Sequence, residues 1–171
     1  FEPDLAARRR LTDNAFLNGF EGLVEIRPEA VSSFQGKAAF TTGRDTVNRL
    51  VDSDDDTLWV EVPVTTMDRA IEGRVPTAIK KDVEGCEANV LAGASETLCS
   101  ESLLALMVEL WNPDSGGTLL TLNRAGFIPF NYDPFTRTLC QRVDAVAGNV
   151  IFIRDSDSLQ LKLRSAPPFT I

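Results

Sequence analysis

The chain has 171 residues, of which 43% are hydrophobic and 25% are charged. This composition is typical of a globular domain of ordinary size, which buries a core without needing disulfides or bound metals. The formal net charge of −8 argues against a nucleic acid as the main partner, because phosphate binding needs clustered Lys and Arg. No apolar stretch approaches the roughly 20 residues of a membrane helix, so we expect a protein that does not enter membranes.

Histidine is absent and the chain has three cysteines, Cys86, Cys99 and Cys140. The cysteines lack metal-ligand spacing, so we expect free thiols in the reducing cytoplasm and no bound metal. Without histidine, Ser-His-Asp and Cys-His catalysis are excluded. General-base work falls to carboxylates, Lys, Tyr or Cys.

The first half of the chain predicts helices and strands in alternation. Apolar spacing predicts a helix over 4–20 that ends near Gly19. Alternating patterns predict strands over 23–31, 37–42 and 58–64. The polar segment 43–57 is predicted to be a surface loop, since its aspartate run lacks the Gly and Glu positions of a calcium-binding loop. A short helix is predicted through Ile71.

The second half predicts a βαβ unit followed by a smaller antiparallel part. Segment 77–83 is predicted to be a strand and segment 87–98 a helix with four apolar positions on one face: Val90, Leu91, Ala94 and Leu98. The apolar run 103–108 is typical of a strand buried on both faces of a parallel sheet. The remaining predictions are a helix over 118–125, antiparallel strands over 127–132 and 150–153, and a C-terminal extension over 155–171.

Acidic residues follow both strands of the predicted βαβ unit. Lys80, Asp82 and Glu84 share one face of their strand, and Gly85 supplies the turn after it. Glu109 follows the second strand. Open parallel sheets bind ligands beyond the carboxyl ends of their strands, so these residues are candidate site residues. Lys80 is placed to pair with Asp82 or Glu84 and tune it. The structural alternative is that Asp82 or Glu84 caps the following helix.

Five motifs, in this order and spacing, resemble the FkbM-type methyltransferases, S-adenosylmethionine-dependent enzymes that largely methylate hydroxyl groups of sugars and natural products. The motifs are Phe1-Glu2-Pro3 with Asn14 and Asn18, Val64 to Asp68, Lys80 to Gly85 with Glu87, Val90 to Ala94, and Val108-Glu109. The resemblance implies an α/β fold with a Rossmann-like methyltransferase sheet and helices on both faces. It also implies a partial domain over 1–154, because the family's N-terminal strand, helix and glycine-rich turn have no counterpart before Phe1.

The resemblance also implies roles for single residues. It assigns Glu2 to the ribose hydroxyls of the cofactor and Glu29-Ala30-Val31 to the segment against adenine. Glu2 without the resemblance is an ordinary surface carboxylate. Asp82 falls near the transferred methyl group, which makes it both a cofactor-binding and a catalytic candidate.

Glu84 and Glu109 are the other catalytic candidates. Asp82 then serves as general base on a substrate hydroxyl, or Asp82, Glu84 and Glu109 hold a divalent cation. Asp68 either caps its short helix or binds substrate. Lys81 stands where the family usually has an apolar residue, which suggests a locally more open sheet.

These features predict an S-adenosylmethionine-dependent methyltransferase that O-methylates a small molecule or glycan, such as a sugar or natural product. One alternative is a non-catalytic Rossmann-like binding domain in which the acidic residues only stabilise turns. A second is a carboxylate-metal phosphotransferase or hydrolase.

Overall fold

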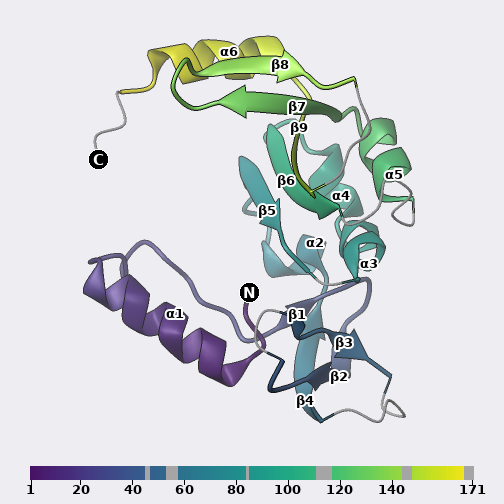
Figure 1. Cartoon of the computed structure of the whole chain (residues 1–171). Helices are drawn as coiled ribbons and strands as arrows, with labels where there is room; N and C mark the ends of the chain where they lie inside the picture. Colours follow the sequence, from purple (N-terminus) through teal and green to yellow (C-terminus); the bar gives the residue numbers. More distant parts are fainter. Residues whose placement is uncertain (45–46, 53–57, 84, 111–116, 144–147, 168–171) are drawn as a thin grey trace. The chain divides into compact units, whose positions relative to one another are not determined.

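The computed structural model describes residues 1–44, 47–52, 58–83, 85–110, 117–143 and 148–167 (Figure 1). The chain divides into two compact units, one made of Phe1–Gly73 and Val83–Ser95 and the other of Arg74–Asp82 and Glu96–Ile171. Each unit carries its own sheet. The predicted mixed α/β class is confirmed, although the described strands form two sheets where one was predicted. None of the described helices has the length and apolar character needed to span a membrane.

Helix α1, Leu5–Leu17, opens the first unit. Asp4 caps it by accepting a hydrogen bond from the Ala7 N–H at 2.7 Å. Gly19 follows its end with a φ of 68°, a left-handed conformation that favours glycine. The helix predicted over 4–20 is therefore confirmed, with slightly shorter bounds.

The first sheet has the strand order β1-β4-β2-β3. Its strands are β1 Ala30–Val31, β2 Gly36–Thr41, β3 Leu50–Val51 and β4 Trp59–Thr65. Strand β1 pairs with β4 in parallel, and the other pairs are antiparallel. A buried apolar cluster holds the sheet together: Ala30, Phe40, Val62 and Val64. The strands predicted over 37–42 and 58–64 are confirmed.

The strand predicted over 23–31 is wrong for the residues before Ala30. Pro28 has no N–H to donate to a ladder. Leu23 and Val24 are 82% and 42% exposed, so little apolar burial favours an extended pairing there. One strand-like bond joins this segment to the start of the chain, from the Glu2 N–H to the Arg27 carbonyl at 2.8 Å.

Two short helices complete the first unit, α2 Met67–Ala70 and α3 Glu87–Ala92. Thr66 caps α2 by accepting a hydrogen bond from the Arg69 N–H. The short helix predicted through Ile71 is confirmed. Gly85, with a φ of 71°, forms the predicted turn before α3.

The helix predicted over 87–98 is interrupted at Gly93, and α4, Ser95–Cys99, follows as a separate helix. The Gly93 carbonyl accepts a hydrogen bond from the Asp68 N–H at 3.0 Å instead of continuing the helix. All four residues of the predicted apolar face are nevertheless buried: Val90, Leu91, Ala94 and Leu98.

The second sheet has the strand order β5-β6-β9-β7-β8. Its strands are β5 Ala78–Lys81, β6 Ala105–Leu110, β7 Ile128–Asp133, β8 Thr138–Gln141 and β9 Gly148–Ile153. Strands β5 and β6 are parallel, as the predicted βαβ unit requires. Strand β9 is antiparallel to both β6 and β7, so the predicted antiparallel pairing is confirmed.

One face of the second sheet is buried at the central strands β6 and β9, through alternate residues that include Val108, Val150 and Phe152. Lys81 is also on a buried face and only 4% exposed, so the expectation of a more open sheet at this residue is wrong. Helix α5, Thr118–Arg124, ends before Gly126 as predicted.

A last helix, α6 Ser156–Ser165, lies in the segment that the sequence analysis described only as an extension. Asp155 caps it by accepting from the Ser158 N–H. Gln160 ties it to β8, because its Oε1 accepts from the Leu139 N–H at 2.9 Å and its Nε2 donates to the Arg137 carbonyl at 2.8 Å.

Candidate functional site

The first unit contains a cavity of about 710 Å³ beside Glu29. Its wall consists of charged side chains of both signs, the residues just before β1 and the end of β4. The lining residues are Arg27, Glu29, Gln35, Gly36, Pro63, Val64, Thr65, Asp68, Arg69 and Glu72.

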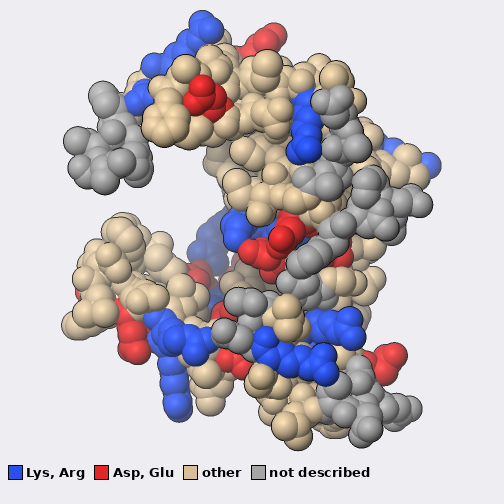
Figure 2. Space-filling model, in the orientation of Figure 1, with Lys and Arg blue, Asp and Glu red and all other residues tan. Residues whose placement is uncertain are grey.

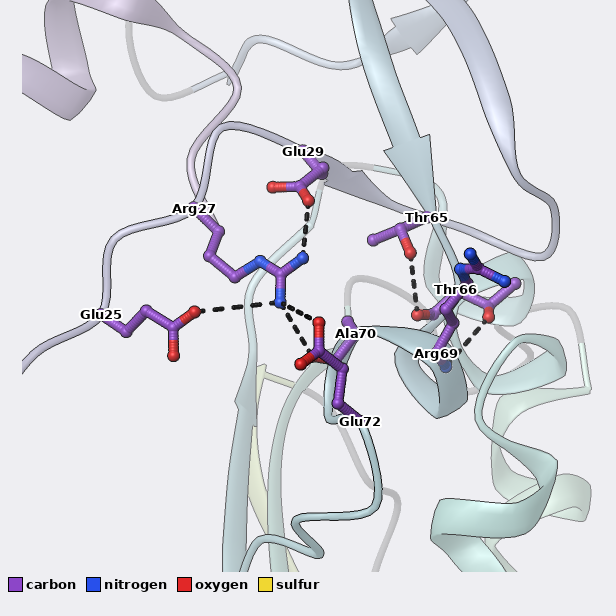
Figure 3. Close-up of polar contacts among 8 residues, drawn as sticks. All are labelled: Glu25, Arg27, Glu29, Thr65, Thr66, Arg69, Ala70 and Glu72. Atoms are coloured by element: carbon purple, nitrogen blue, oxygen red, sulfur yellow. Dashed lines mark hydrogen bonds and ion pairs between the residues drawn. The ribbon is translucent and has the colours of Figure 1, made fainter.

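Arg27 organises one side of this cavity (Figure 3). Its Nη2 donates to Glu29 Oε1 at 2.7 Å, and its Nη1 donates to the Ala70 carbonyl at 3.0 Å. Two further carboxylates lie near Nη1, Glu72 at 3.7 Å and Glu25 at 3.9 Å. These contacts fix the guanidinium and, through it, the carboxylate of Glu29.

Glu29 lines the cavity and has one carboxylate oxygen that Arg27 does not use. The hydrogen bond from Arg27 lowers the pKa of Glu29, and burial opposes this effect. The same bond raises the pKa of Arg27. Glu29 Oε2 is buried and has no hydrogen-bond partner among the described residues. A buried carboxylate oxygen of this kind favours a ligand that donates a hydrogen bond.

Glu2 and Ala30 also lie in the first unit. Glu2 Oε1 accepts from the Asp4 N–H at 2.9 Å, a local bond that uses one of its two carboxylate oxygens. Ala30 is buried in β1. Glu2 therefore has a structural role at the start of α1, and its role in cofactor binding stays a prediction.

Asp68 does not cap its helix, because Thr66 does. Its Oδ2 instead accepts a hydrogen bond from Ser95 Oγ at 3.3 Å, and the residue lines the cavity. The capping alternative for Asp68 is wrong, and a role in ligand binding stays a prediction.

The second unit brings Asp82 together with Lys80 and Glu109. Lys80 Nζ lies 2.7 Å from Asp82 Oδ2, in a pair whose side chains are 60% and 50% exposed. The hydrogen bond from Lys80 lowers the pKa of Asp82, burial opposes it, and a hydrogen bond with Glu109 lowers it further. Lys80 therefore favours the ionised form of Asp82.

The register of β5 and β6 explains why Asp82 and Glu109 are neighbours. Lys81 pairs with Val108, so Asp82 and Glu109 are the next residues of two parallel neighbours. Glu109 belongs to β6 itself and does not follow it, because the strand runs on to Leu110. Charged side chains of opposite sign lie next to each other elsewhere on the visible surface too (Figure 2).

The alternative in which Asp82 caps the following helix is wrong. The cap residue of α3 is Cys86, which makes no side-chain capping bond, and the Gly85 N–H donates to Glu87 Oε1. Glu84 lies outside the described residues, so its predicted role stays untested. Within the described part of the chain, no three His, Cys, Asp or Glu side chains are grouped so as to hold a metal ion.

A sequence model described as the Methyltransferase FkbM domain matches residues 1–129. The chain belongs to the FkbM methyltransferase domain family. The comparisons with curated proteins and with solved structures gave no match. The FkbM match covers the whole first unit and, in the second, the strands that carry Lys80 and Glu109.

Sequence reasoning missed one charged centre of this FkbM domain. Glu25, Arg27 and Glu29 alternate in the sequence and therefore share one side of an extended segment. That spacing of opposite charges was the available signal. Glu72, which joins them from beyond α2, carried no such signal because its approach depends on the fold.

Proposed function

We propose that this FkbM domain transfers a methyl group from S-adenosylmethionine to a hydroxyl group of a small molecule or glycan, with Asp82 as general base. The observation that carries the proposal is the position of Asp82, ionised by Lys80 and next to Glu109 at the carboxyl ends of two parallel strands. Ligands of open α/β sheets bind at such strand ends.

The second sheet supports a Rossmann-like arrangement. Strands β5, β6 and β7 run in one direction, since β9 is antiparallel to both β6 and β7. In doubly wound sheets, three parallel strands follow one another in chain order on one side of the switch point. Here β9 is inserted between the second and third of them.

The residues of the first unit fit the cofactor. The buried Oε2 of Glu29 is an acceptor suited to the amino group of adenine, and Ala30 is its neighbour on β1. The second carboxylate oxygen of Glu2 is suited to the ribose hydroxyls. Glu2, Glu29 and Ala30 would hold the nucleoside, and the bound cofactor supplies a methyl group activated on sulfonium sulfur.

Asp82 does the protein's part of the chemistry. The Asp82 carboxylate would take the proton of the acceptor hydroxyl while that oxygen is methylated. Lys80 keeps that carboxylate ionised before the reaction. Glu109 is its neighbour on the adjacent strand.

Substitution Asp82→Asn tests the proposal. The amide keeps the size of the side chain but cannot take the proton, so we expect kcat to fall by roughly 10²- to 10⁴-fold. The assay is transfer of tritium from methyl-labelled S-adenosylmethionine to a panel of methyl glycosides. Asp157→Asn, the same change on α6, serves as control. Wild-type turnover by Asp82→Asn would remove Asp82 from catalysis and favour a binding domain.

A further inference from the structure

Three polar side chains form one row across the second sheet. Asp82 neighbours Glu109, as the Lys81–Val108 register requires, and Glu109 is in turn registered with Asn149 on β9. Registered residues of neighbouring strands project to the same face of a sheet. Asp82, Glu109 and Asn149 therefore occupy one face at one level. Asp82 and Asn149 are exposed and Glu109 is half-buried.

The next row on the same face is mostly apolar. Lys80 is registered with Met107, and Met107 with Ile151. Met107 and Ile151 are half-buried. The face thus offers an apolar strip bordered by a polar row, whereas the opposite face is closed by packed side chains such as Val108 and Val150.

The spacing of the row sets the size of what it can bind. Neighbouring strands lie about 4.8 Å apart, so Asp82 and Asn149 are separated by about 10 Å across the sheet. Two hydrogen bonds of about 2.8 Å then leave about 4 Å between the two ligand oxygens, which suits two separated hydroxyl groups of one sugar ring, above a C–H surface that lies on the apolar strip.

Asn149 differs from the two acids in what it can recognise. Its carboxamide both donates and accepts hydrogen bonds and carries no charge, so it can bind a hydroxyl group as donor or acceptor. A second hydroxyl bound there fixes which other hydroxyl of the same ring faces Asp82. Asn149 is then a positioning residue that sets the site of methylation.

We propose that Asn149 binds the methyl acceptor through a second hydroxyl group, and that the row of Asp82, Glu109 and Asn149 takes a ring that carries both hydroxyl groups. This inference rests on the function proposed above, because it places the reacting hydroxyl at Asp82. It adds the acceptor-binding residue and the need for two hydroxyl groups.

The test combines Asn149→Leu with deoxy sugars. The probes are the methyl glycosides of glucose, galactose, mannose and rhamnose, together with the monodeoxy forms of each glycoside that binds. Binding of each glycoside is measured by saturation-transfer NMR. Methyl transfer to it is measured with labelled S-adenosylmethionine. Losing one hydrogen bond should weaken the binding of a glycoside about ten-fold and raise KM equally, with kcat nearly unchanged.

A deoxy glycoside that lacks the second hydroxyl should bind wild-type protein and Asn149→Leu alike. Asn131→Leu is the matched control, an exposed asparagine of β7 whose side chain projects to the face opposite that of Phe130. Asn149→Ser, which keeps a polar group, guards against misfolding of the leucine variant and should recover part of the affinity.

The outcomes separate this inference from the proposed function. If the protein binds S-adenosylmethionine but none of the glycosides, or if Asn149→Leu binds them as wild type does, the inference is overturned and the proposed function stands. If calorimetry detects no S-adenosylmethionine binding, the proposed function fails. In that case, the effect of Asn149→Leu on glycoside binding would still test whether the row of Asp82, Glu109 and Asn149 binds the sugar.

Discussion

Replacing Gly93 with alanine should destabilise the first unit strongly. A Cβ added at Gly93 would lie 2.1 Å from the Ser32 carbonyl oxygen, and 3.1 Å from the Ser32 carbonyl carbon. Ordinary contacts begin at 3.4 Å, so the two segments must separate by about 1.3 Å. The atoms that meet the new methyl group belong to backbone, so no side-chain rotation relieves the clash. The φ of Gly93 is −84°, which any residue adopts, so space alone requires glycine here.

The size of the effect follows from what the separation breaks. Overpacking of this kind costs roughly 1–3 kcal/mol. The shift also strains the bond from the Asp68 N–H to the Gly93 carbonyl and the bond from the Ser32 N–H to the Thr65 carbonyl, each worth about 1 kcal/mol. Alanine also lowers the conformational entropy of the unfolded chain, which offsets up to about 1 kcal/mol of this loss in stability. The expected net loss is about 2–3 kcal/mol.

Urea unfolding followed by circular dichroism measures this loss, which should lower the midpoint by about 1 M. Gly22→Ala is the matched control, since a Cβ there meets no atom within 4 Å. Its midpoint should stay the same or rise slightly. Equal midpoints for the Gly93 and Gly22 variants would refute the close approach of Gly93 to Ser32.

Three further predictions follow from charged contacts. The pKa of Glu29 is lowered in the folded state, so its pairing with Arg27 stabilises the protein above the unfolded pKa of about 4.3, and this contribution is lost as the pH falls through the folded pKa. In urea titrations, the stability difference between wild type and Glu29→Gln should therefore stay constant down to about pH 4.3 and shrink below it; a difference that stays constant there too would contradict the pairing. Lys80→Met removes the main cause of the lowered pKa of Asp82, so the acid limb of the pH profile of kcat/KM should move to higher pH, and an unmoved limb would exclude Asp82 as the base. Arg154 donates to the carbonyls of Leu98 and Ser100 and lies over the Phe127 ring at 4.4 Å, so Arg154→Met should cost about 2–4 kcal/mol in urea unfolding, and a loss below about 1 kcal/mol would count against these contacts.

Local signals were enough to predict most of the helices and strands. Asp4 and Gly19 bracket α1 because capping and left-handed turns depend on neighbouring residues alone. Gly85 and Gly126 mark turns for the same reason. The apolar face from Val90 to Leu98 was predicted correctly because burial follows the helical period even where the helix is interrupted.

The wrong predictions concern segments whose structure depends on residues far away in the sequence. The interruption at Gly93 depends on Ser32 and Asp68, which are more than 20 residues away in the sequence. The extended segment before Ala30 has strand-forming residues but lacks a continuous hydrogen-bonded neighbour among the described residues. Lys81 was expected at an open position because burying its charge is costly, yet the packing of the strands around it leaves it only 4% exposed.

The candidate site was partly predictable for the same reason. The placement of Asp82 beside Glu109 follows from parallel pairing, which the apolar runs of two strands predicted. The cavity beside Glu29 also needs Asp68 and Glu72, which come from another part of the fold. Asn149 could not be chosen from the sequence because its register with Glu109 is a property of the sheet.

Isothermal titration of S-adenosylmethionine into the protein tests the central claim most directly. The account predicts saturable binding of one cofactor per chain, weakened by Glu29→Gln, which alters the carboxylate at the cavity, and unchanged by the control Glu96→Gln on α4. Absence of binding heat, or equal affinity of wild type and Glu29→Gln, would contradict the claim that this FkbM domain holds its cofactor at Glu29.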